Sequence, residues 1–148
     1  MEPTIEDRVS TFLASLSTLS LATIGIHGEP HLADLFFASD ADLKAYFVSS
    51  PDSRHTQNLA RDRRVAVSIH RQTWDWREIA GLQMEGTVEM LEQPIQREEA
   101  WMLYKAKFPF VENFADEIAR SHWYRFSPRW IRMIDNRLGF GHREEFRV

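Results

Sequence analysis

The stretch YFVSSPDSRHTQNL, residues 46–59, contains the sharpest change of pattern in the chain. Residues 43–49 are rich in apolar and aromatic side chains and predict a strand. Residues 50–53, Ser-Pro-Asp-Ser, break that strand, because proline cannot donate to a ladder and serine and aspartate favour turns and helix N-caps. Residues 54–62 then predict a short helix. This strand–cap–helix unit indicates a fold that mixes sheet and helix.

The first turn of that helix carries two side chains suited to phosphate, Arg54 and His55. A helix N-terminus offers free N–H groups and the positive end of the helix dipole. An arginine guanidinium adds a fork of charge-assisted hydrogen bonds, and Ser49 and Ser53 would add hydroxyl donors. An exposed Arg–His pair on an amphipathic helix explains the same residues as well. From these residues alone, both interpretations stand.

Strands are predicted on both sides of this unit. Thr4 and Asp7 form a capping-box pattern for an N-terminal helix. Gly86, inside a long predicted strand, indicates a bulge or a bend, and Pro94 opens a helical region that reaches residue 120. The predicted strands cover about residues 18–26, 31–38, 43–49, 65–70, 79–91, 122–126 and 130–135, followed by a tail that ends at Val148. The order predicts an α+β fold with enough strands to close a barrel.

Composition excludes several classes of protein. The 148 residues are enough for one domain with its own core, and 43% hydrophobic against 27% charged residues is an ordinary globular balance. The formal charge of −4 gives no general attraction for nucleic acid. The absence of cysteine excludes disulfides and thiolate chemistry. An acidic N-terminus without a long apolar run predicts a cytoplasmic protein that does not enter a membrane.

No common catalytic or metal motif is present. The six histidines show no His-x-x-x-His spacing and no acidic partner at ligand spacing, so we predict no metal site. The chain has no Gly-x-Ser-x-Gly elbow, no P-loop and no Gly-x-Gly-x-x-Gly sequence. The sequence patterns alone therefore name no catalytic acid, base or nucleophile.

The order of the segments resembles the pyridoxamine-phosphate-oxidase-like FMN proteins. In that family a strand delivers a Ser or Thr, and a loop with a basic pair opens a short helix, as residues 46–59 do here before RVAVS, residues 64–68. GLQMEGTVE, residues 81–89, is similar to a second family strand, and HGEP, residues 27–30, to the first hairpin turn. IDNRLGFG, residues 134–141, resembles an uncharacterised enterobacterial branch. Many relatives carry Lys where His55 stands, which implies weaker or pH-dependent phosphate binding.

The resemblance implies an antiparallel split β-barrel with flanking helices, one FMN-binding domain over residues 1–148, and FMN as cofactor. It places Asp34, Leu35 and Phe36 near the isoalloxazine ring. It also places Val48 and Ser49 beside the ribityl-phosphate arm, Arg54 and His55 at the phosphate, and Gln83 on the flavin of a partner subunit. We therefore expect a homodimer with shared flavin sites, because a small barrel with five Trp, ten Phe and five Met would leave apolar surface exposed.

The leading functional hypothesis is an FMN-dependent oxidoreductase acting on an unidentified small molecule, in which the flavin carries the redox step. Arg137-Leu138 is followed by Gly139, whereas true pyridoxamine-phosphate oxidases carry Arg-Leu-His there, which argues against vitamin B6 oxidase activity. Two alternatives stay open. One is a haem-binding or haem-degrading split-barrel protein with a ligand such as His142, and the other is a non-catalytic flavin-binding module.

Overall fold

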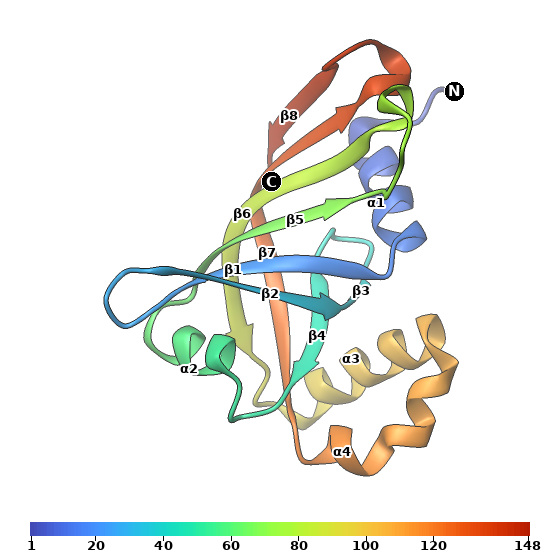
Figure 1. Ribbon diagram of the computed structural model, residues 1–148. Helices are drawn as coiled ribbons and strands as arrows, with labels where there is room; N and C mark the ends of the chain where they lie inside the picture. The colour runs from blue at the N-terminus through green and yellow to red at the C-terminus, as the bar shows by residue number, and fades with distance from the viewer.

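The computed structural model describes residues 1–148 as one curled antiparallel sheet with helices around it (Figure 1). The strands are β1 (Thr18–Ile24), β2 (Pro30–Phe36), β3 (Ala38–Ser39), β4 (Ala45–Ser49), β5 (Arg64–His70), β6 (Ala80–Met90), β7 (His122–Asp135) and β8 (Arg143–Arg147). The helices are α1 (Ile5–Ser15), α2 (Arg54–Arg61), α3 (Pro94–Lys107) and α4 (Ala115–Ala119), with 3-10 segments η1 (Trp76–Glu78), η2 (Pro109–Phe114) and η3 (Asn136–Leu138).

The sheet curls because of how its ends are connected. Its strand order is β2-β1-β5-β6-β7-β4-β3, with β8 also paired to β7. β2 and β3 lie at opposite ends of this order, yet only Phe37 separates them in the chain. Two peptide units span at most about 7 Å, so both ends of the sheet must meet. No ladder joins β2 to β3 or β4. The predicted α+β split barrel is thus confirmed. The chain itself connects the two ends of the sheet at Phe37, but no backbone hydrogen bonds join the two edge strands.

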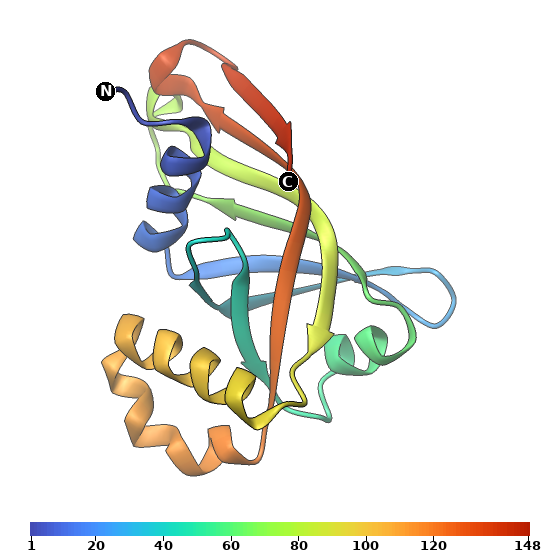
Figure 2. The same ribbon diagram turned by 180° about the vertical axis from the view of Figure 1, so that it is seen from behind.

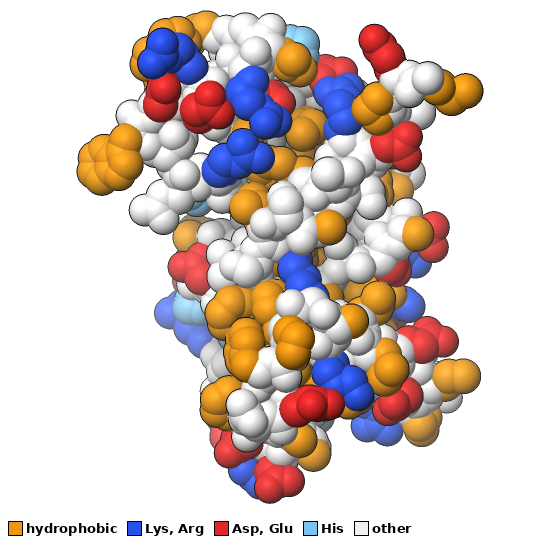
Figure 3. Space-filling view, turned by 90° about the vertical axis from the view of Figure 1, so that its right-hand side faces the viewer, with side chains coloured by type: hydrophobic (Ala, Val, Ile, Leu, Met, Phe, Trp, Pro, Cys, Tyr) orange, Lys and Arg blue, Asp and Glu red, His pale blue; other side chains and the backbone are white.

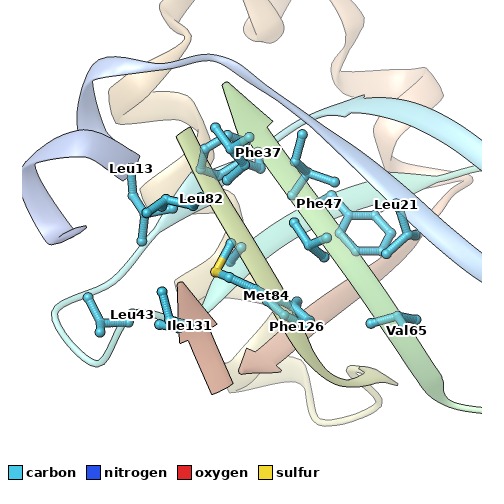
Figure 4. Packing of buried hydrophobic residues seen from close by; sticks show 14 of the residues in the cluster. Leu13, Leu21, Phe37, Leu43, Phe47, Val65, Leu82, Met84, Phe126 and Ile131 are labelled. Atoms are coloured by element: carbon cyan, nitrogen blue, oxygen red, sulfur yellow. The ribbon is translucent and has the colours of Figure 1, made fainter. Parts of the chain in front are cut away.

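The core fills the inside of this curl. Twenty-one buried residues form one cluster, to which the sheet and α1 both contribute. Figure 4 shows Phe37, from the link between β2 and β3, Phe47 of β4 and Phe126 of β7 pointing into the same interior, and all three are fully buried. A second cluster of eight buried residues lies between α3, η2 and the β3–β4 corner. In Figures 1 and 2, α1 and α3 lie on one side of the sheet and α2 lies by the β1–β2 hairpin.

The N-terminal helix and the bulge follow the sequence. Thr4 and Asp7 make both hydrogen bonds of the capping box, each of 3.1 Å. The β6–β7 ladder shifts register between Glu85 and Gly86, which confirms the predicted irregularity at Gly86. Glu85 is opposite Trp130 and Gly86 is opposite Pro128, so Arg129 is the extra residue of a β-bulge.

The prediction of two separate strands, 122–126 and 130–135, was wrong. β7 is one strand of 14 residues that crosses Pro128 without ending. Proline is tolerated there because the bulge already interrupts the ladder. β7 consequently forms the spine of the sheet: β6 follows one edge along its whole length, while β4 and then β8 share the other edge.

The predicted C-terminal tail is also a strand. Residues 143–147 form β8, and Phe146 packs against the main core. Gly139 and Gly141 have φ of 137° and 69°, conformations that favour glycine, and they allow the chain to turn from β7 into β8. The pattern Arg-Glu-Glu-Phe-Arg gives little strand signal by itself, and the β7 edge supplies the ladder that stabilises it.

Two strand boundaries close to residues 46–59 differ from the prediction. The strand expected over 31–38 ends at Phe36 and resumes as β3 after Phe37, because the chain crosses there from one end of the sheet to the other. The strand expected from residue 43 begins at Ala45, since Leu43 has a φ of 64° in the preceding turn. None of the four helices is both long enough and apolar enough to span a lipid bilayer.

Candidate anion site at the start of α2

The junction between β4 and α2 gathers hydrogen-bond donors at one point. β4 ends at Ser49, and α2 begins at Arg54 after the N-cap residue Ser53, whose hydroxyl accepts a hydrogen bond from the N–H of Thr56. The first N–H groups of a helix have no acceptor inside it. Those of Arg54 and His55 are therefore available to an anion, next to the Ser49 hydroxyl and the Arg54 guanidinium.

A hydrogen bond between buried side chains fixes the position of α2 on the sheet. The Asn58 amide donates to the Thr23 hydroxyl of β1 at 3.0 Å, and both residues are almost fully buried. The Arg61 guanidinium donates to the Asn58 side-chain oxygen Oδ1 at 2.8 Å. α2 is thereby held against Thr23 of β1, and His31 near the start of β2 lies opposite Thr23.

The His55 ring is buried beneath this junction, at 9% exposure. Its Nε2 lies 2.8 Å from Ser49 Oγ and 3.3 Å from Ser53 Oγ. Burial, and secondarily the charge of His31, lower the pKa of His55 below its usual value. At neutral pH the ring is therefore neutral, so it acts as a hydrogen-bonding group and contributes no charge.

Arg54 has the opposite character, with a side chain that is 57% exposed. Its guanidinium lies 3.5 Å from the Glu29 carboxylate, which belongs to the turn between β1 and β2. The N–H of Glu29 itself, followed by that of His27, lowers the pKa of the Glu29 carboxyl, so the group is ionised at neutral pH. An exposed pair at this distance is weak, roughly 0–1 kcal/mol, so an incoming anion can displace Glu29.

The three predicted residues of β2 divide between two faces, as neighbours on a strand must. Leu35 points inward and packs against the main core. Asp34 points outward and accepts a hydrogen bond from the Ser20 hydroxyl at 2.6 Å. Phe36 is 46% exposed, and its ring centroid lies 5.2 Å from that of Phe108 and 6.1 Å from that of Phe110.

This aromatic group lies at the far end of β2 from the α2 donors. His31 and Phe36 are five residues apart, or about 16 Å along a strand. The outer edge of β2 pairs with no strand between these points. In Figure 3, hydrophobic side chains gather on the lower half of the face that includes α3 and η2. The free edge of β2 thus runs from the hydrogen-bond donors of α2 at one end to the aromatic side chains of Phe36, Phe108 and Phe110 at the other.

The remaining predicted residues lie in different places. Val48 is half-buried on β4, beside Ser49, and packs against the smaller core cluster. Gln83 is exposed on the outer face of β6, between Ser68 of β5 and Arg132 of β7. The chain therefore brings Val48, Ser49, Arg54 and His55 together, places Asp34, Leu35 and Phe36 along one strand, and leaves Gln83 apart from both groups.

The outer face around Gln83 has a floor of small side chains. Ser20, Ala22, Ala66 and Ser68 line it on β1 and β5, and Leu32 of β2 stands at its edge. A hollow of about 660 Å³ continues this floor across β6 and β7. Its rim carries three arginines, Arg64, Arg129 and Arg147. The hollow also reaches Thr23, Gly28 and Pro30 at the β1–β2 hairpin.

The family follows from comparison with known sequences. The pyridoxamine 5′-phosphate oxidase family model matches residues 5–135, which is every element from α1 to the end of β7. The chain belongs to the pyridoxamine 5′-phosphate oxidase family.

Three known proteins are similar to this chain. A UPF0306 protein of Enterobacter sp. strain 638 is 29% identical over 115 residues, which are 77% of each chain. The conserved hypothetical protein Rv2991 of Mycobacterium tuberculosis is 26% identical, with a TM-score of 0.79 over 95% of this chain and 91% of that one. The haem storage protein HutZ of Vibrio cholerae shares the fold, with a TM-score of 0.73 over 98% of this chain and 95% of that one, at 15% identity.

Within this pyridoxamine 5′-phosphate oxidase fold, the sequence reasoning missed three contributors to the site. Glu29 and His31 approach α2 only because the β1–β2 hairpin folds against it. Phe108 joins Phe36 across more than 70 residues of chain. A capping box or a strand–helix junction is local and can be recognised in the sequence, whereas these three contacts depend on the closed barrel.

Proposed function

We propose that this chain is an FMN-binding flavoprotein and a flavin-dependent oxidoreductase of the pyridoxamine 5′-phosphate oxidase family. The observation that carries the proposal is the donor group at the start of α2, formed by the Ser49 hydroxyl, the Arg54 guanidinium and two free N–H groups. These groups are chemically complementary to a phosphate dianion. The aromatic end of β2 adds apolar surface for a planar ring.

The residues present fit FMN better than riboflavin. Four donors at one point have value only for a ligand that carries an anionic group, and Arg54 is opposed in the free protein by a single weakly held carboxylate. When bound, the flavin supplies the two-electron chemistry. In this proposal Ser49, Arg54 and His55 hold and orient the phosphate end, while Asp34, Leu35, Phe36 and Val48 border the rest of the ligand. The substrate is a small molecule.

Purified protein decides between the candidate cofactors by its absorbance spectrum. We expect the paired blue and near-ultraviolet bands of flavin, and tighter binding of FMN than of riboflavin to the apoprotein. Equal affinity for both flavins would refute the assignment of a phosphate site at the start of α2. A flavin spectrum that dithionite bleaches but that no reduced nicotinamide nucleotide in a panel bleaches would favour the non-catalytic flavin-binding module.

Haem is the second candidate because HutZ, a haem storage protein, shares this fold. His142 is the ligand expected from the sequence. Its Nε2 lies 3.3 Å from the Glu144 carboxylate, which leaves Nδ1 as the ring nitrogen for iron. A sharp Soret band that disappears in His142→Ala would support haem against FMN.

The proposal includes a C2 homodimer with shared flavin sites. Gln83 and the α2 donors of one chain lie apart, so Gln83 can reach a ligand held at α2 only from a second copy. The small-residue floor and the exposed Leu32 beside it offer a shallow surface that a second copy can cover. An isologous interface would use this face twice and create two equivalent sites.

A further inference from the structure

The His55 ring nitrogen nearest the proposed phosphate site lies between two hydroxyl groups. Nε2 is 2.8 Å from Ser49 Oγ and 3.3 Å from Ser53 Oγ. A neutral imidazole nitrogen either donates or accepts a hydrogen bond, depending on the tautomer. The tautomer of His55 therefore decides whether Ser49 receives a hydrogen from the ring or must give its own hydrogen to it.

The other contacts of Ser53 bear on the tautomer of His55. Its hydroxyl lies 3.0 Å from the carbonyl oxygen of Ser50, which can only accept, and 2.7 Å from Thr56 Oγ1. Its oxygen also accepts from the Thr56 N–H as the cap of α2. A serine has a single hydroxyl hydrogen, and these partners occupy it. With its hydrogen on Ser50 or Thr56, Ser53 can only accept toward His55, and this favours the tautomer that carries the ring hydrogen on Nε2.

The consequence falls on Ser49. In that tautomer Nε2–H donates to Ser49 Oγ, and the Ser49 hydroxyl makes no other hydrogen bond in the protein. Its own hydrogen stays free for a ligand, although the residue is only 8% exposed. In the opposite tautomer Ser49 would donate to His55 and present only lone pairs to the phosphate, which would repel it.

We propose that Ser53 is a positioning residue that fixes the Nε2–H tautomer of His55, so that Ser49 becomes the hydroxyl donor to the ligand phosphate. His55 then acts through Ser49 and does not touch the phosphate. This inference rests on the proposed function, which names the ligand, and it assigns Ser53, His55 and Ser49 three different tasks at the same site.

A double-mutant cycle on FMN affinity separates this relay from direct contact. Ser49→Ala should weaken FMN binding about tenfold or more, because the lost hydrogen bond is to a charged group. His55→Leu should weaken it severalfold alone but by less than about twofold when Ser49 is already alanine. His55→Gln, whose amide can place an N–H where Nε2 stands, should restore affinity. Fully additive losses would overturn the relay.

Nitrogen-15 spectra of the imidazole rings test the tautomer without any ligand. The signals missing from His55→Gln identify His55, and they should show a protonated Nε2 in the unmodified protein and in Ser53→Thr. Ser53→Ala should populate the other tautomer. An unprotonated Nε2, or a tautomer unaffected by Ser53→Ala, overturns the positioning role. Riboflavin affinity, measured on every variant, should stay constant. If the unmodified protein does not prefer FMN to riboflavin, the proposed function is wrong. The spectra test the effect of Ser53 on the His55 tautomer independently of that result.

Discussion

At the scale of single residues, Arg54 and His55 are neighbours in sequence with unlike roles. Arg54 is exposed and lies 3.5 Å from its partner Glu29, whereas His55 is buried under the junction. The sequence prediction treated the two as one basic pair. Helical geometry separates them, because consecutive residues point about 100° apart: the Arg54 side chain faces solvent, and the His55 side chain packs against Ser49 of β4. The charge offered to an anion therefore comes from Arg54.

Replacing Arg54 with alanine should weaken FMN binding roughly tenfold to a hundredfold, since a charge-assisted hydrogen bond is worth about 1.5–3 kcal/mol. The apoprotein should melt at nearly the same temperature, because an exposed arginine contributes little to stability. Arg97→Ala, which removes an exposed arginine of α3, is the control and should leave FMN affinity unchanged. Titration and thermal melts of both variants measure this. A large loss of melting temperature with intact affinity would make Arg54 structural.

Removing the charge of Glu29 should have the opposite effect on FMN affinity. Its carboxylate pairs with Arg54 and repels an approaching phosphate. Glu29→Gln should therefore strengthen FMN binding a fewfold, and the gain should shrink at high salt, where exposed charges are screened. Riboflavin, which lacks the phosphate, should bind equally well before and after the change. Weaker FMN binding by Glu29→Gln would show that the carboxylate supports the site.

At the scale of elements, an ion pair ties α1 to β8. Arg8 donates two hydrogen bonds of 2.8 Å to the Glu144 carboxylate. The Arg8 hydrogen bond, with a smaller contribution from His142, lowers the pKa of Glu144 to about 2. A carboxyl whose pKa is lower in the folded state stabilises the fold above its unfolded pKa, and this stabilisation is lost as pH falls.

The stability of the fold should therefore decrease between about pH 4.5 and pH 2 as Glu144 becomes protonated. Both side chains are about one-third exposed, so we expect a loss of only about 1 kcal/mol. Denaturant unfolding of the unmodified protein and of Glu144→Gln, followed across this pH range, isolates the contribution. The variant should be less stable at neutral pH and less sensitive to acid. Parallel pH profiles would contradict the assignment.

The bulge between β6 and β7 depends on glycine at position 86. A Cβ there would overlap the carbonyl oxygen of Ser127 and lie 2.9 Å from Pro128 Cα, so backbone would have to move. Gly86→Ala should destabilise the fold by about 1–3 kcal/mol, as overpacking typically does. Glu85→Ala, at the neighbouring exposed position, should cost less than about 0.5 kcal/mol. Urea unfolding compares the two, and equal stabilities would mean that the bulge relaxes freely.

At the scale of the whole molecule, the proposed dimer predicts that one substitution separates assembly from folding. Leu32 is 64% exposed on the outer face, and Leu32→Glu should dissociate the dimer and weaken FMN binding together. Ile95→Glu changes a 71% exposed residue of α3 in the same way and should do neither. Sedimentation at micromolar concentration, with and without FMN, reports both. A monomer that still binds FMN tightly would end the shared-site proposal.

The sequence by itself determined the local units of this protein. The capping box at Thr4, the cap and helix at 53–61, the irregularity at Gly86 and the order of helices and strands all depend on residues close together in the chain. The family resemblance rests on the same local segments and was confirmed over residues 5–135. Such features are readable because capping, turn formation and side-chain alternation act over a few residues.

Only the tertiary structure decided which of these units meet. β8 has a weak pattern and forms because β7 offers a free edge, and β7 stays continuous across Pro128 because the bulge absorbs the proline. His55 is buried because the β1–β2 hairpin and β4 close over it, which also brings Glu29 and His31 to α2. Burial and pairing between distant segments depend on the closed sheet, and the closure follows from β2 and β3 being joined through Phe37 alone.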